Sequence, residues 1–166
     1  MPPTKLLILI ILLSCTPRPS AQDATPLDLS PLSADQISIY NAFLASYTVG
    51  GRHRLNLINQ TYPLRPKDLS ADCLQGTGVA LGPANSAAHH LDSQALAGSN
   101  ITLIDPTPLE TGLRLSEVAF DPSHRYAVMS YRYHCGSLCG HGSTVVYEKK
   151  DGKWQPTKRK CPAWIS

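Results

Sequence analysis

The chain lacks the short motifs that mark the common catalytic centres. It contains no Gly-x-Ser-x-Gly elbow, no His-Glu-x-x-His zinc motif, no phosphate-binding glycine loop and no Ser-x-x-Lys ahead of a helix. The glycines at residues 76, 78 and 82 lack the strand-to-helix context that a dinucleotide site requires. These absences favour a non-catalytic protein, and the motifs predict no catalytic residue.

Charge of one sign is also scarce. Fifteen lysine and arginine residues face 12 aspartate and glutamate residues, and only 16% of all residues are charged. The one basic concentration, between residues 149 and 160, is typical of a solvated strand face. Because no basic footprint of the required size is present, we expect no nucleic-acid partner.

No apolar run is long enough to span a bilayer as a helix. The longest, LLILIILL at residues 6–13, follows Lys5 and has the length of a signal-peptide core. The adjoining LLSC string at residues 12–15 resembles a bacterial lipobox. We therefore predict that residues 1–14 form a signal peptide and that Cys15 carries the lipid.

Cleavage after Ala21 is the alternative, and it would give a soluble secreted or periplasmic protein. We favour the lipoprotein because Pro19 stands where this later site wants a small residue. Residues 15–32 are rich in Pro, Ser, Thr and Ala without an apolar period, which is typical of a flexible tether. The expected partners are the membrane, through the lipid anchor, and an unknown ligand or protein of the cell envelope.

Residues 33–166 are of a size that suits one domain. Ser33 and Gln36 indicate the start of a helix over residues 34–46, where apolar side chains recur at helical spacing. A second, short helix is predicted over residues 86–97. Predicted strands cover residues 55–64, 101–105, 113–120, 127–134 and 144–149, and a last strand opens at Trp154 after an Asp151-Gly152 hairpin turn.

This order of elements predicts an α+β fold, with the N-terminal helix packed on a mainly antiparallel sheet that ends in a four-strand meander. Trp164 and Ile165 are expected to fill the core. The strings CGSLCG at residues 135–140, EKKDGKW at 148–154 and WIS at 164–166 resemble a loose group of uncharacterised bacterial exported proteins. The resemblance implies an envelope location and a small sheet domain, and it implies no activity.

With Cys15 assigned to the lipid, four cysteines remain, and an even number in an exported protein indicates disulfides. Four cysteines allow three pairings. Proximity in the loop favours Cys135 with Cys139, which leaves Cys73 with Cys161.

The loop over residues 134–142 also supports a metal- or redox-active alternative. If the hairpin turn is tight, Cys161 falls opposite Gly142, and Cys/His side chains converge on one rim of the sheet. Thiolate and imidazole ligands suit zinc or copper. The alternative ligand set is His134, Cys135, Cys139, His141 and Cys161.

His89 and His90, close to Asp92, form a weaker candidate site. A histidine beside an acid can act as an oriented general base, as in hydrolases. Adjacent histidines on a helix point about 100° apart, so only one could serve a given pocket. We therefore favour a surface helix that carries two histidines.

Overall fold

The computed structural model describes residues 26–47, 54–96, 100–107, 111–136 and 138–166. The predicted signal peptide, the lipidation site Cys15 and the tether up to residue 25 lie outside the described residues. The two α-helices are α1 (Ala34–Ser46) and α2 (Ala71–Leu74), and two 3-10 turns span Pro66–Asp68 and Pro83–Asn85. The strands are β1 (Leu27–Asp28), β2 (Leu55–Ile58), β3 (Ala88–His89), β4 (Ile101–Ile104), β5 (Gly112–Leu115), β6 (Ala119–Phe120), β7 (Tyr126–His134), β8 (Gly140–Lys150), β9 (Lys153–Pro156) and β10 (Ala163–Ile165).

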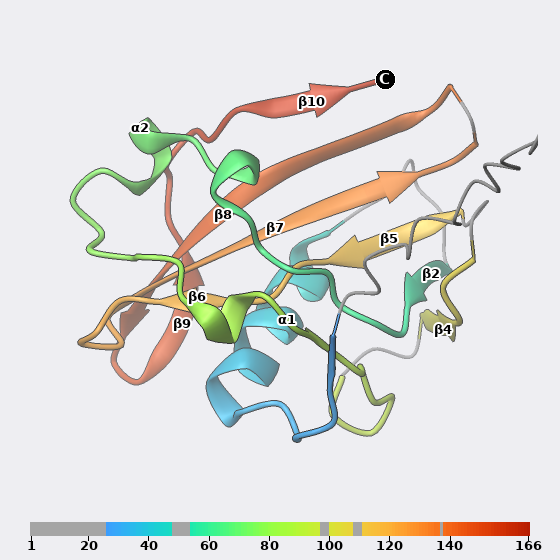
Figure 1. Ribbon diagram of the computed structural model, residues 1–166, viewed down its shortest axis with the longest axis horizontal. Helices are drawn as coiled ribbons and strands as arrows, with labels where there is room; N and C mark the ends of the chain where they lie inside the picture. The colour runs from blue at the N-terminus through green and yellow to red at the C-terminus, as the bar shows by residue number, and fades with distance from the viewer. Residues whose placement is uncertain (1–25, 48–53, 97–99, 108–110, 137) are drawn as a thin grey trace, which may run out of the picture.

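Eight strands form one curled sheet, in which the long β7–β8 hairpin is central (Figure 1). The strand order is β10-β8-β7-β5-β2-β4, and β6 and β9 add to β7 and β8 beside this path. β2 runs parallel to β4 and β5, whereas the other pairings of this sheet are antiparallel. A strand-rich sheet with two α-helices agrees with the predicted α+β fold class.

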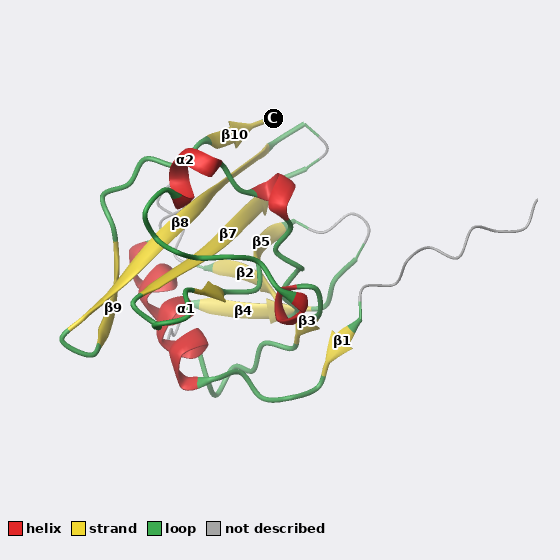
Figure 2. Ribbon diagram, turned by 60° about the vertical axis from the view of Figure 1, so that its left-hand side comes forward, coloured by secondary structure: helices red, strands yellow, loops and turns green. Residues whose placement is uncertain are grey.

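The two faces of the sheet bury different parts of the chain, and α1 and α2 lie on opposite sides of it (Figure 2). α1 buries Tyr40 and Phe43 against alternate strand residues such as Met129. On the other face, Cys73 of α2 packs with Val128 and neighbouring strand residues. This second face carries the site described below.

Two local predictions are confirmed. α1 starts at a capping box, since the Ser33 hydroxyl accepts from the Gln36 amide and the Gln36 side chain accepts from the Ser33 amide. The Asp151-Gly152 turn joins β8 to β9 with Lys150 opposite Lys153. Both turn residues have positive φ, at 50° and 73°, as a two-residue type I′ hairpin requires.

The predicted helix over residues 86–97 is wrong. Ala88–His89 form β3, and the chain then turns over residues 93–96. The backbone of residues 89–91 bonds to a neighbouring segment: the Leu91 amide donates to the Asn59 carbonyl, and the His89 carbonyl accepts from the Thr61 amide. β3 also pairs with β1, so Leu27–Asp28, which we predicted as flexible tether, belong to the ordered structure.

Two predictions for residues 161–165 are also wrong. After Pro156 the chain leaves the β8 ladder and returns as β10, in a register that places Trp164, not Cys161, opposite Gly142. Trp164 and Ile165 are 38% and 87% exposed, so neither fills the core.

Among the helices of the described residues, none has the length and hydropathy needed to cross a membrane.

Candidate ligand-binding groove

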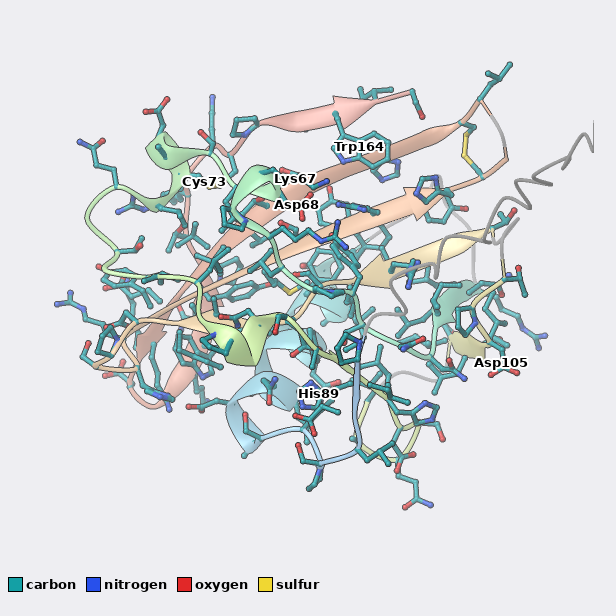
Figure 3. All side chains as sticks on the ribbon, in the orientation of Figure 1. Lys67, Asp68, Cys73, His89, Asp105 and Trp164 are labelled. Carbon is teal, nitrogen blue, oxygen red and sulfur yellow. A yellow bond between two sulfur atoms is a disulfide. The ribbon has the colours of Figure 1, made fainter. Side chains whose placement is uncertain are left out.

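A groove lies on the face of the sheet that α2 covers. It consists of two hollows, of about 310 Å³ and about 450 Å³, which share Tyr62, Lys67, Asp68 and Arg132. One wall is the segment that leads from β2 to α2, and the other is β10. Figure 3 shows Lys67 and Asp68 on the first wall, facing Trp164 on the second. The combined volume suits a small ligand.

Asp68 fixes the first wall to the sheet. Its carboxylate accepts a hydrogen bond of 2.7 Å from Nη2 of Arg132, on β7. The Asp68 carbonyl accepts from the Thr144 hydroxyl, on β8, at 3.3 Å. At the floor of the groove the hydroxyls of Ser130 and Thr144 lie 2.8 Å apart and share a hydrogen bond. The position of the wall therefore depends on contacts inside the groove itself.

Arg132 occupies the centre of the groove. Its guanidinium lies over the Tyr62 ring, with Cζ 4.4 Å from the ring centroid. Tyr62 is 7% exposed, and burial raises the pKa of its hydroxyl, against the opposing charges of Arg132 and Arg114. The ion pair and the ring hold the guanidinium plane in one orientation. A fixed plane favours bidentate hydrogen bonding to the two oxygens of an oxyanion.

The β5–β7 ladder places a second arginine, Arg114, directly opposite Arg132. Like charges directly opposite each other on antiparallel strands destabilise the pair. The larger hollow is lined by the cations Arg65, Lys67, Arg114 and Arg132 and by one acid, Asp68. The groove therefore has a positive electrostatic potential, which favours an anion.

Trp164 forms the aromatic part of the groove. Its indole lies across Gly140 and Gly142 of β8, so close that a Cβ at Gly142 would lie 2.5 Å from Nε1 of the indole. One face of the ring therefore packs on bare backbone. The remaining exposure, 38%, leaves a flat apolar surface beside Lys67 and Asp68. Glycine in β8 is what allows this close approach.

The 134–142 loop does not assemble the predicted metal ligands. His134 and His141 point to opposite faces of the sheet, because His134 contacts the Trp164 ring and His141 contacts Tyr133 on the α1 side. Cys135 pairs with Cys139, and Cys161 pairs with Cys73 of α2, both at disulfide distance. These are the two pairs that the sequence favoured. Within the described residues no cluster of His, Cys, Asp and Glu suited to a metal ion is found.

His89 belongs to a polar cluster inside the protein, together with Thr61 and Glu117; we call these three residues the buried cluster. Nδ1 of His89 lies 2.9 Å from one oxygen of Glu117, and Nε2 lies 3.3 Å from a carboxylate oxygen of Asp28. Because both ring nitrogens face carboxylates, neither is directed at a substrate. This geometry does not suit a general base. His90 and Asp92 are exposed, and Asp92 caps the following turn through the Gln94 amide.

Sequence reasoning missed the groove. Arg114 and Arg132 both lie in predicted strands, and the pairing of those strands would have placed two arginines side by side. The register, however, was not predicted for β5 and β7. Trp164 was assigned to the core because tryptophan is mostly apolar, and its exposure follows only from the register of β10.

No family model matches the sequence, no curated protein is significantly similar to it, and no solved structure matches the fold. The groove is therefore interpreted from its own geometry.

Proposed function

We propose that this protein is a non-catalytic lipoprotein domain of the bacterial cell envelope, which binds a small ligand in the groove. The observation that supports binding is the cross-strand pair of Arg114 and Arg132 on the floor of a preformed groove. Together with Lys67 and Arg65 at the rim, these arginines give the groove an excess of cationic side chains, which favours an anionic ligand.

The envelope location is supported by the sequence of the leader and by the cysteines. The apolar run at residues 6–13 and the lipobox-like string ending at Cys15 are the basis for anchoring. Two cysteine pairs at disulfide distance are compatible with an oxidising compartment. In this proposal α1 packs on one face of the sheet, the β5–β9 region forms a meander, and the groove on the opposite face, beside α2, is open to the ligand.

The anchoring is tested by producing the full chain in a bacterial host, as wild type and as Cys15→Ser. The wild type should appear in the membrane fraction with the mass of a lipid added at Cys15, and the variant should lose both. A soluble wild type that begins after Ala21 would contradict the lipoprotein and support the secreted alternative.

Intact mass separates the binding role from a metal site in the 134–142 loop. The denatured wild type should be about four mass units lighter than the thiol form, because each disulfide removes two hydrogens. Full-weight thiols with a bound ion in the native spectrum would contradict the proposal and return the active centre to the 134–142 loop.

A further inference from the structure

We infer that the ligand of the groove is an acidic saccharide, in which a sugar ring stacks on Trp164 and a carboxylate or phosphate binds at Arg132. The inference rests on the proposed function and adds the chemical class of the ligand. It depends on three parts of the groove that lie side by side in the same hollow: a fixed guanidinium, a row of hydroxyls and a flat aromatic surface.

The guanidinium defines the charged end of the ligand. Asp68 engages one terminal nitrogen of Arg132, and the Tyr62 ring supports the guanidinium plane. A guanidinium carries five N–H donors, so donors remain for the two oxygens of a carboxylate or phosphate. Lys67 and Arg65 are exposed at the rim, and neither forms an ion pair with an acidic side chain among the described residues. Their charges add to the attraction for an anion.

The opposite end of the hollow selects a ring. Trp164 presents one face of its indole, while Gly142 and Gly140 support the other face. Trp164 is one of five large apolar side chains that remain exposed in the described part of the chain, and it lines the smaller hollow. The C–H face of a pyranose ring is apolar and flat enough to cover an aromatic side chain, while its hydroxyls point outward at the ring edge.

The surface between these two ends is polar. Four serine and threonine side chains line the hollow: Ser70, Ser130, Ser143 and Thr144. The hydroxyls of the last three already bond within the protein, and their oxygens can accept further hydrogen bonds that a hydrocarbon chain could not supply. A sugar supplies hydroxyls that both donate and accept. The order of cation, hydroxyls and indole therefore matches a phosphorylated or carboxylated sugar better than a lipid tail.

The test is an NMR titration of the full chain with four probes: glucuronic acid, glucose 1-phosphate, glucose and inorganic phosphate. The first two should shift the Trp164 indole N–H signal. Glucose should bind about tenfold more weakly or worse, because it lacks the charge-assisted hydrogen bonds to Arg132. The same loss is expected when Arg132→Met is titrated with glucuronic acid.

Arg125→Met is the matched control. Arg125 also pairs with a carboxylate, Glu148 at 3.2 Å, and lies over a tyrosine ring, but it is outside the groove. Its removal should leave the affinity for glucuronic acid unchanged. If Arg132→Met does not fold, Lys67→Met provides the same test, since the Lys67 side chain is exposed and forms no part of the core.

Each contrary outcome has a distinct meaning. If phosphate and glucose 1-phosphate bind with equal affinity and Trp164→Ala has no effect, the groove binds only the anion. That result would overturn the inference that the ligand is a saccharide. Equal affinity for glucose and glucuronic acid would overturn the inference that the ligand carries an acidic group. Binding of none of the four probes would overturn the inference as a whole, while membrane attachment and intact mass would still decide the proposed function.

Discussion

Thr61 and Tyr62 are consecutive residues, yet they belong to two polar regions of opposite character. The Thr61 side chain belongs to the buried cluster, where its hydroxyl donates to Glu117. The Tyr62 ring faces the groove, beneath Arg132. One segment therefore contributes to an internal network through one residue and to a ligand-accessible surface through the next, because successive side chains of an extended segment point in opposite directions.

The regions differ in how completely their charges are satisfied. Glu117 is 1% exposed, and its oxygens are met by the Thr61 hydroxyl, the His89 amide at 3.1 Å, the His89 ring and the Gln36 amide group at 3.5 Å. The groove instead collects four cations around one acid. A largely hydrogen-bonded buried network stabilises one fold, whereas exposed cations such as Lys67 and Arg65 at the rim of the groove leave charge for a ligand. Substitutions in the first should change stability, and substitutions in the second should change binding.

Glu117→Ala should have the largest effect on stability. It removes the acceptor that the Thr61 hydroxyl and the His89 amide share and the carboxylate that faces the His89 ring. Each buried polar group left without a partner costs roughly 1–3 kcal/mol. The measurement is the free energy of unfolding in urea.

Glu148→Ala is the control, because Glu148 pairs with Arg125 and Lys150 near the surface and should cost less than about 1 kcal/mol. A folded Glu117→Ala protein of normal stability that no longer binds glucuronic acid would show that the buried cluster serves the ligand directly, which would remove the distinction between the two regions.

Gly142→Ala should have an intermediate effect and sharpen the distinction. The added Cβ would lie 2.5 Å from both the Trp164 indole and the Tyr131 carbonyl, so the ring, the strand or both must shift. Overpacking of this kind typically costs 1–3 kcal/mol. The variant should lower the midpoint of urea unfolding and move the NMR signal of the Trp164 indole N–H.

Gly152→Ala is the control. Its added Cβ has no atom within 4 Å, but Gly152 has a positive φ of 73°, so the substitution lowers stability without changing the groove. Equal spectra of the Trp164 indole in the two variants would contradict the close contact across β8.

Asp35 should give the smallest effect, and it depends on pH. Burial alone would raise the pKa of Asp35, but hydrogen bonds from Lys149, Trp154 and His124 outweigh it and hold the pKa below its usual value. A carboxyl whose pKa is lowered in the folded state stabilises the fold above its unfolded pKa of about 3.9, and this contribution disappears as the pH falls through the folded pKa.

The free-energy difference between the wild type and Asp35→Asn should therefore be constant from pH 7 to pH 5 and shrink below about pH 4. Its size should stay under about 1 kcal/mol, as for other partly exposed ion pairs. Urea unfolding of both proteins across this range measures it, and a difference that grows toward low pH would contradict the assigned sign.

Short sequence patterns predicted the elements that are stabilised by contacts between residues close together in the sequence. The Ser33–Gln36 capping box, the turn at Asp151-Gly152 and the alternation along β7 each lie within a few residues of the structure they specify. The helix over 86–97 failed because its backbone bonds to residues 59–61, about 30 positions earlier, a pairing that no local pattern carries.

The buried cluster and the groove depended on such distant pairings even more. Glu117 meets His89 across 28 positions, and Arg132 meets Asp68 across 64. The expected convergence of Cys161 with the 134–142 loop failed for a related reason: the chain after Pro156 leaves the ladder before β10 rejoins it, and the register counted from the hairpin turn no longer applies.

The Cys73–Cys161 pair lies between the two walls of the groove. Cys73 follows Leu69 and Ser70 of one wall, and Cys161 precedes Pro162 and Trp164 of the other. A covalent bond there limits how far the two walls can separate, so the width of the groove is set before a ligand binds. Reduction would remove this cross-link and leave each wall held only by its hydrogen bonds to β7 and β8.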